Sequence, residues 1–162
     1  MANVFDLVKG EAHVVAESSR LKATGAGHIY DLEMIEDTDN GTIVNLGAHV
    51  EGQVYKAAVY AEGKKPYLVL TPALAYNGKK AWSDEKYFYN AKGEIARAYE
   101  LYVDDIYTIS ADAFTGTPAV GKFADATYAI KESAPESGFA VEIIEEVNYT
   151  NSVSYRVRVI AL

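Results

Sequence analysis

The sequence predicts an all-β fold, an antiparallel sandwich or barrel with an extended N-terminal arm. Short segments rich in β-branched and aromatic residues recur between turn-forming residues. Apolar and polar residues alternate along the last of these segments, and no segment sustains the apolar spacing of an amphipathic helix. Short strands at this spacing are typical of sandwiches and barrels.

Residues 1–27 are expected to form an arm followed by a flexible joint. The stretch from Glu17 to Gly27 is small, polar and rich in glycine, which favours a flexible connection. Residues 28–162 are then expected to form a single β domain, because a chain of this length can bury one self-sufficient core. The apolar residues of the arm are candidates for contact with a partner, and they are Val4, Phe5, Leu7, Val8, Val14 and Val15.

Eight segments of the body are predicted to be strands. The Asn40-Gly41 pair lies between the first two, and this dipeptide favours a tight hairpin turn, so these two strands are expected to pair antiparallel. In the last segment Arg156 and Arg158 lie on the face opposite the apolar residues, and that face is expected to be solvated or to pair with acidic neighbours. The predicted strands are Ile29–Ile35, Thr42–Leu46, Val54–Tyr60, Tyr67–Leu70, Arg97–Val103, Ile106–Ser110, Phe139–Glu145 and Val153–Ile160.

The charge balance and the missing cysteines exclude several classes of partner and site. The chain has 15 Lys and Arg against 23 Asp and Glu, for a net charge of −8, and its basic residues are scattered. Nucleic-acid binding requires clustered basic residues, so no nucleic-acid partner is expected. No apolar run approaches the roughly 20 residues of a membrane-spanning helix, and no membrane partner is expected. Without cysteine there are no disulfides and no thiolate chemistry.

No catalytic or metal-binding pattern stands out, and the protein is expected not to be an enzyme. The spacing of His13, His28 and His49 matches no metal motif, and no Gly-x-Ser-x-Gly nucleophile turn occurs. Residues 36–41 resemble the start of a calcium loop, but Gly47 stands where the bidentate glutamate would be, so a turn is expected there. The sequence therefore predicts neither a cofactor nor a metal site.

Aromatic residues concentrate between Trp82 and Tyr107. Exposed aromatic side chains supply large, rigid contact area for a protein or a sugar partner. The same residues also fill the core and the cross-strand pairs of antiparallel sheets, and the sequence leaves both roles open. Trp82 lies in a polar context and is the first candidate for contact, followed by Tyr87 and Tyr89.

The order of several segments resembles small head proteins of tailed bacteriophages, of the decoration or head-auxiliary kind. The resemblance implies a structural protein that binds the outer surface of the assembled head and stabilises or decorates it. Its implied partners are the major capsid protein and further copies of itself, for example in a trimer. Its implied location is the outer head surface of the virion, which assembles in the cytoplasm of the bacterial host. The segments that carry the resemblance are Gly41–Gly47, Leu70–Pro72, Tyr87–Tyr99, Asp105–Phe114 and Thr117–Gly121.

Two other functions stay open. The aromatic cluster around Trp82 and Tyr87–Tyr89 would suit a carbohydrate-binding or adhesin-like β module, in which two or three exposed aromatic rings stack on sugars. A tail or neck subunit would be another virion component with the same absence of catalytic motifs.

Overall fold

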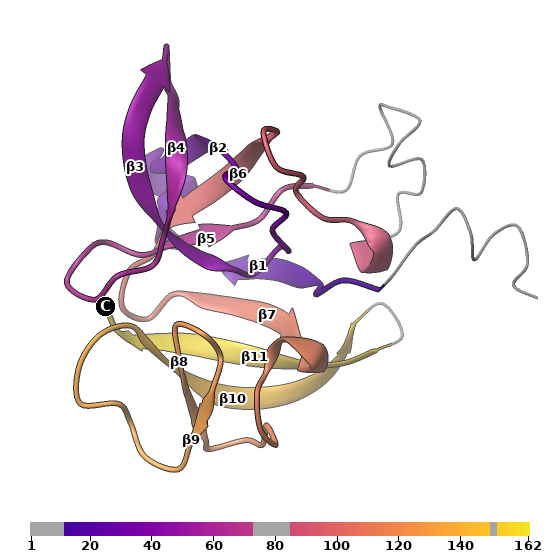
Figure 1. The fold of residues 1–162 in the computed structure, drawn as a ribbon. Helices are drawn as coiled ribbons and strands as arrows, with labels where there is room; N and C mark the ends of the chain where they lie inside the picture. The colour runs from indigo at the N-terminus through magenta and orange to yellow at the C-terminus, as the bar shows by residue number, and fades with distance from the viewer. Residues whose placement is uncertain (1–11, 73–84, 150–151) are drawn as a thin grey trace, which may run out of the picture.

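The all-β prediction is confirmed by the computed structural model, which describes residues 12–72, 85–149 and 152–162 (Figure 1). The strands form two sheets, a closed barrel in the order β2-β4-β3-β5-β6 and a six-stranded sheet in the order β1-β7-β11-β10-β8-β9. The strands are β1 (Ala16–Arg20), β2 (Ile29–Glu33), β3 (Ile43–Glu51), β4 (Val54–Val59), β5 (Tyr67–Val69), β6 (Ile95–Glu100), β7 (Ile106–Ser110), β8 (Phe123–Asp125), β9 (Ile130–Lys131), β10 (Ala140–Tyr149) and β11 (Ser152–Ala161). Helical turns in the described part are α2 (Lys22–Ala26), η2 (Glu85–Tyr87) and η3 (Ala111–Ala113).

The interior of the barrel is filled by alternate residues of its strands. Successive side chains of a strand point to opposite faces, so every second residue reaches the barrel axis. Tyr30, Leu46 and Tyr55 pack at the margin of this interior cluster. Its buried members are Leu32, Met34, Val44, Ala57, Tyr67, Val69, Ala96 and Ala98.

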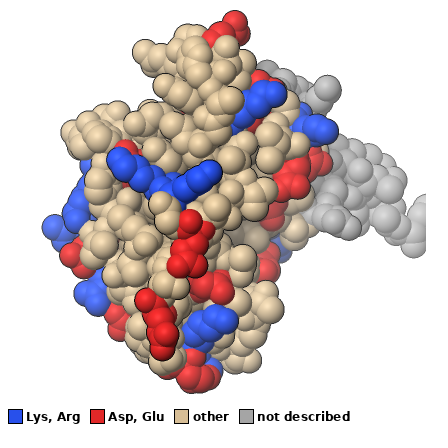
Figure 2. Space-filling view, turned by 60° about the vertical axis from the view of Figure 1, so that its left-hand side comes forward, with Lys and Arg blue, Asp and Glu red and all other residues tan. Residues whose placement is uncertain are grey.

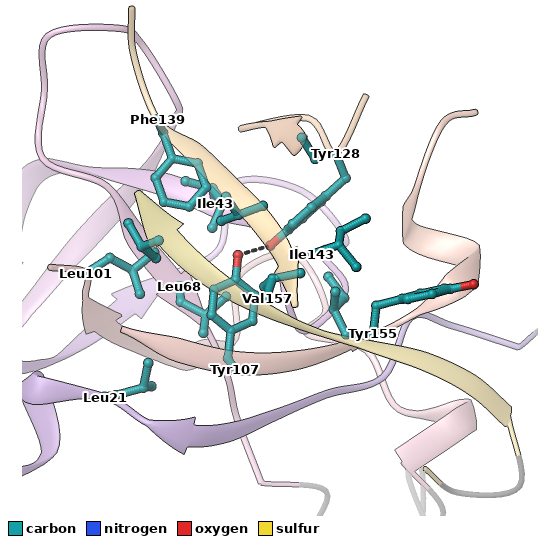
Figure 3. Packing of buried hydrophobic residues seen from close by; sticks show 14 of the residues in the cluster. Leu21, Ile43, Leu68, Leu101, Tyr107, Tyr128, Phe139, Ile143, Tyr155 and Val157 are labelled. Atoms are coloured by element: carbon teal, nitrogen blue, oxygen red, sulfur yellow. Dashed lines mark hydrogen bonds between the residues drawn. The ribbon is translucent and has the colours of Figure 1, made fainter. Parts of the chain in front are cut away.

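A second, larger core lies between the barrel and the six-stranded sheet (Figure 3). Ile43 and Leu68 leave the barrel on its outer side and pack with residues of the sheet such as Phe139 and Val157. All of β5 is therefore buried, because Tyr67 and Val69 face the barrel interior while Leu68 faces the sheet. This double burial explains why β5 is a short run of consecutive apolar residues rather than an alternating one.

The two sheets are joined at Gly41, which precedes β3. Its N–H donates to the carbonyl of Val69 in β5 (2.7 Å), and its carbonyl accepts the hydroxyl of Tyr128 (2.6 Å). The Tyr128 hydroxyl also lies 2.8 Å from the hydroxyl of Tyr107 on β7 (Figure 3). Both tyrosines are buried, and this burial raises the pKa of each above its ordinary value, so the hydroxyls stay protonated and hydrogen-bonded.

The neighbouring Asn40 ties the same turn to two other segments. Its Nδ2 donates to the carbonyl of Thr71 (2.8 Å), and its Oδ1 accepts the N–H of Thr71 (3.0 Å) and the Nδ2 of Asn90 (3.0 Å). Asn40 is 7% exposed, and its bond to Asn90 is buried while its bonds to Thr71 are partly buried. A buried amide satisfied in this way fixes the local geometry, since an unmet group would cost about 1–3 kcal/mol.

The predicted hairpin between the first two strands is wrong. Strand β2 pairs in parallel with β4 and antiparallel with β6, whereas β3 pairs with β4 and β5. Asn40 and Gly41 do form a turn, but the positive φ of Gly41 (92°) brings the backbone against β7 instead of reversing the chain. A side chain at this position would meet Ile109, which is why glycine is required.

The predicted flexible joint from Glu17 to Gly27 is also wrong. Strand β1 pairs antiparallel with β7, and the short helix α2 follows it. Leu21 and Ala23 are buried in the shared core, and Gly27 ends the helix in the left-handed conformation. The small residues of this segment allow close packing here, and their abundance does not indicate flexibility.

Other sequence expectations differ in detail. The predicted strand Arg97–Val103 instead runs from Ile95 to Glu100, and Asn90, before it, makes an isolated bridge with Thr38. Strands β8 and β9 have only three and two residues, too short for an alternating pattern to reveal them. The polar face of β11 does pair with acidic neighbours, as expected, through Arg156 with Glu145 and Arg158 with Glu142.

Replacing Gly41 with alanine should destabilise the protein far more than the same change at Gly121. The two glycines have nearly equal φ angles, 92° and 90°. A Cβ at Gly41 would lie 2.7 Å from Cδ1 of Ile109 and 3.3 Å from Cβ of Ala16, whereas a Cβ at Gly121 meets nothing within 4 Å. Urea unfolding should give a loss of about 1 kcal/mol for Gly121→Ala and about 2–4 kcal/mol for Gly41→Ala. Equal losses would mean that the junction tolerates a side chain.

Candidate interaction site

The residues predicted to contact a partner fall into three groups. Val15 is 4% exposed and belongs to the core, whereas the half-buried Val14 packs against the shared core and also lines the groove described below. Tyr87 and Tyr89 are half-buried, and Tyr89 stacks on His13 with 4.8 Å between ring centroids. The others, Val4, Phe5, Leu7, Val8 and Trp82, lie outside the described residues.

An open groove of about 530 Å³ lies between the barrel and the sheet. One wall is the segment 36–43 that links β2 to β3, together with Val59 and Tyr60 at the end of β4. The other wall comes from Ile109 on β7 and the turn 126–128 between β8 and β9. The groove is thus a direct product of the junction at Gly41, which holds these walls at a fixed distance.

The rim of the groove is acidic. Glu36 and Asp37 are exposed on it, and the half-buried Asp39 lies beside them. None of the described residues that line the groove is lysine or arginine. The surface therefore favours a ligand with positive charge.

Asp39 holds the N-terminal segment against the groove. Its Oδ1 lies 2.6 Å from Nδ1 of His13, and its Oδ2 accepts the N–H of Val14 (3.0 Å). The N–H of His13 donates to the carbonyl of Lys86 (2.7 Å), next to η2. The described chain thus begins beside the groove, with its first residues fixed by backbone and side-chain bonds.

Two exposed apolar side chains extend the groove along β4. Val59 is 71% exposed and Ile35 is 43% exposed, and both border a narrow depression of about 70 Å³. The depression and the groove share residues Glu36 and Val59, among others, so they form one continuous surface. Exposed apolar groups with a polar rim are typical of interaction sites. We call this surface, made of Ile35, Glu36, Asp37, Val59 and the groove they border, the β4 groove.

The described residues contain neither a metal cluster nor a membrane-spanning helix. Among them, no group of three or more His, Asp or Glu side chains could hold a metal ion. The described part also contains no helix long and apolar enough to cross a membrane. The β4 groove offers apolar contact area and carboxylates, which can hold a ligand.

A buried carboxylate at one end of the barrel was not predicted from the sequence. Glu100 is 4% exposed, and its Oε2 lies 2.7 Å from Nδ1 of His28 while its Oε1 accepts the Nζ of Lys65 (3.0 Å). Burial alone would raise the pKa of the Glu100 carboxyl, but the bonds from His28 and Lys65 outweigh it and hold the pKa below its ordinary value. Burial, followed by the charge of Glu100, raises the pKa of the adjacent Tyr67 to about 12. The sequence did carry one sign of this site. Glu100 lies among apolar residues of the predicted strand Arg97–Val103, and a buried ionised group needs partners.

Comparison with known proteins gives one family match. A family model described as the YonC prophage protein matches residues 11–134. The matched range contains the whole barrel, the β4 groove and the strands from β1 to β9, and it ends before β10. No curated protein and no solved structure matches the chain.

Replacing Glu100 with glutamine should remove an acid-sensitive part of the stability. A carboxyl whose pKa is lowered by folding stabilises the protein above its unfolded pKa of about 4.3, and that stabilisation is lost as the pH falls through the folded value. At pH 7, Glu100→Gln should cost about 1–3 kcal/mol in thermal or urea unfolding. The difference from the wild type should shrink below about pH 4. Glu51→Gln, at an exposed site, is the control, and a pH-independent difference for Glu100→Gln would contradict the assignment.

Proposed function

The chain belongs to the YonC prophage protein family and is therefore of phage origin, and from this premise we propose that it is a structural virion protein of the phage head. In this proposal the protein binds the outer surface of the assembled head and stabilises or decorates it. The resemblance of its segments to head-auxiliary proteins supports the same role.

The observation that carries the proposal is the exposed apolar surface of the β4 groove. Val59 leaves 71% of its surface in solvent although it lies in a barrel strand. Burying a valine side chain at an interface contributes roughly 1.5–3 kcal/mol. A ligand that binds only the mature lattice stabilises it by mass action, and a modest contribution at each site is repeated over the whole shell.

The distribution of charge supports a protein partner. On the face drawn in Figure 2, acidic and basic side chains are interspersed and form no continuous basic stripe. The net charge of −8 would keep the protein soluble on the outside of a DNA-filled shell and would repel nucleic acid. The proposed partners are the major capsid protein and further copies of this chain, without nucleic acid, membrane or cofactor. The proposed location is the outer head surface of a virion that assembles in the cytoplasm of the bacterial host.

Replacing Val59 with aspartate should weaken binding to phage heads. The probe is a preparation of DNA-free, expanded heads of the phage from which the chain derives, sedimented with the purified protein. Val59→Asp removes apolar contact area and adds a charge to an acidic rim, so the Kd should rise at least tenfold, equivalent to about 1.4 kcal/mol. Val120→Asp is the matched control, because Val120 is 58% exposed and lies outside the β4 groove. If wild-type protein stays in the supernatant, or if both variants sediment like the wild type, the proposal fails.

The arm residues Val4, Phe5, Leu7 and Val8 are proposed as a second contact, by strand addition or as a wedge. A deletion that tests this contact must end before His13, because Asp39 holds His13 and Val14 is packed on the core. Removing residues 2–11 should reduce co-sedimentation with heads and leave the unfolding midpoint unchanged. Unchanged co-sedimentation of the shortened chain would exclude the arm as a contact.

A further inference from the structure

The pairing between the barrel strands β2 and β4 stops partway along β4. They pair in parallel from Asp31 with Val54 to Glu33 with Lys56, and no later pair joins them in the described chain. Strand β4 continues beyond this point to Val59. Strand β2 ends at this last pair, so β4 runs on from Ala57 to Val59 without β2 beside it.

The segment that follows β2 turns toward another part of the chain. The N–H of Met34 donates to the carbonyl of Glu94 (3.0 Å), and the N–H of Gly93 donates to the carbonyl of Met34 (2.8 Å). Further along, Thr38 and Asn90 exchange two backbone bonds of 2.8 Å each. These backbone bonds join Met34 and Thr38 to residues 90–94, and none of them is made with β4.

One edge of β4 is consequently left without a strand partner in the part of the chain that the structure describes. Residues 57–59 pair with β3 through Leu46, Asn45 and Val44 on one edge only. An unpaired edge presents backbone donors and acceptors and is a template for another strand. The depression of about 70 Å³ borders residues 57–60 of this stretch, and Ile35, Glu36, Thr38 and residues 42–44 complete its lining.

The side chains around the unpaired edge of β4 determine which kind of strand could bind to it. Val59 and Ile35 supply exposed apolar surface, and Glu36 and Asp37 supply exposed carboxylates beside it. In a strand, alternate side chains point to opposite faces, so one row can meet apolar surface while the other meets charge. A complementary strand would carry apolar residues in one row and basic residues in the other.

We propose that an extended segment of the major capsid protein, in which apolar and basic side chains alternate, adds as a strand to the free edge of β4. The choice of the capsid protein as the source rests on the proposed function, whereas the strand addition rests on the edge itself. Backbone hydrogen bonds would supply the affinity, and the carboxylates of Glu36 and Asp37 would select the basic row.

The N-terminal arm of this chain is a less suitable occupant. Its apolar residues alternate only in part, and Asp6 and Glu11 outweigh Lys9, so the arm is not complementary to an acidic rim. Occupation by the arm is nevertheless a distinct outcome of the experiment below, because the described chain begins beside the groove.

The test uses the full chain and three synthetic octapeptides, with binding followed by backbone amide shifts in NMR. The first peptide repeats Val-Lys-Val-Thr, the second replaces its lysines with glutamate, and the third carries N-methyl groups on alternate backbone nitrogens of the first. The basic peptide should shift the amides of residues 57–59 and bind at least tenfold more tightly than the acidic one. N-methylation should abolish binding, because it removes the donors that a strand ladder needs.

Variants of the protein test whether the carboxylate of Glu36 itself binds the basic peptide, or whether the net negative charge of the protein attracts it. Glu36→Gln should weaken the basic peptide about two- to fivefold and reduce the dependence on salt, whereas Glu51→Gln, at the exposed end of β3, should leave binding unchanged. Val59→Asp should weaken the apolar contact without unfolding the chain, because Val59 is exposed. Equal effects of Glu36→Gln and Glu51→Gln would overturn the assigned role of Glu36.

The outcomes distinguish this inference from the proposed function. Equal binding of all three peptides, or shifts confined to other strands, would overturn strand addition even if heads still co-sediment with the protein. Peptide binding at residues 57–59 by a protein that does not bind heads would support the edge and overturn the capsid protein as its partner. If deletion of residues 2–11 shifts the amide signals of residues 57–59 in the protein without peptide, the N-terminal arm of this chain occupies the edge of β4.

Discussion

The hydrogen bonds of Gly41 join the two sheets, and those of Asn40 fix the turn that presents it. Gly41 donates to Val69 in the barrel and accepts from Tyr128 of the sheet, while Asn40 binds Thr71 in both directions. A Cβ at Gly41 would press on the sheet, so the close approach depends on the absence of a side chain. The shared core can form only when the sheets approach to this distance, and the walls of the β4 groove are set by the same contact.

The sequence was sufficient to predict strands and insufficient to pair them. Alternation and flanking turn residues are local properties, and they located β5, for example, within one residue of its observed end. The Asn-Gly pair favours a hairpin locally, but the backbone of Gly41 is more stable against β5 and β7, which are distant in sequence. The same limit applies to β1, whose small residues have low packing volume and gain their stability from pairing with β7.

The β4 groove was still less predictable from the sequence, because it includes a strand edge that has no partner among the described residues. Nothing in the residues near Val59 distinguishes an exposed strand edge from a paired one. Among the described residues, one edge of β4 has no partner strand, since the segment after β2 binds residues 90–94 instead. Glu100 is the opposite case. It interrupts an apolar strand, and a buried carboxylate requires cationic partners, so the need for a partner could have been inferred but the identity of His28 and Lys65 could not.

Folding and recognition are coupled through the junction. Gly41 and Tyr128 join the two sheets, and with Asn40 they also line the groove, so the groove cannot widen without breaking the bond between them. A site fixed in this way loses little conformational entropy when it binds, which favours affinity from a small contact area. A ligand that binds only the folded chain also stabilises it, and occupation of the groove should therefore oppose separation of the barrel from the sheet. Under the proposed function, the same contact that completes the fold would then be reinforced by attachment to the shell.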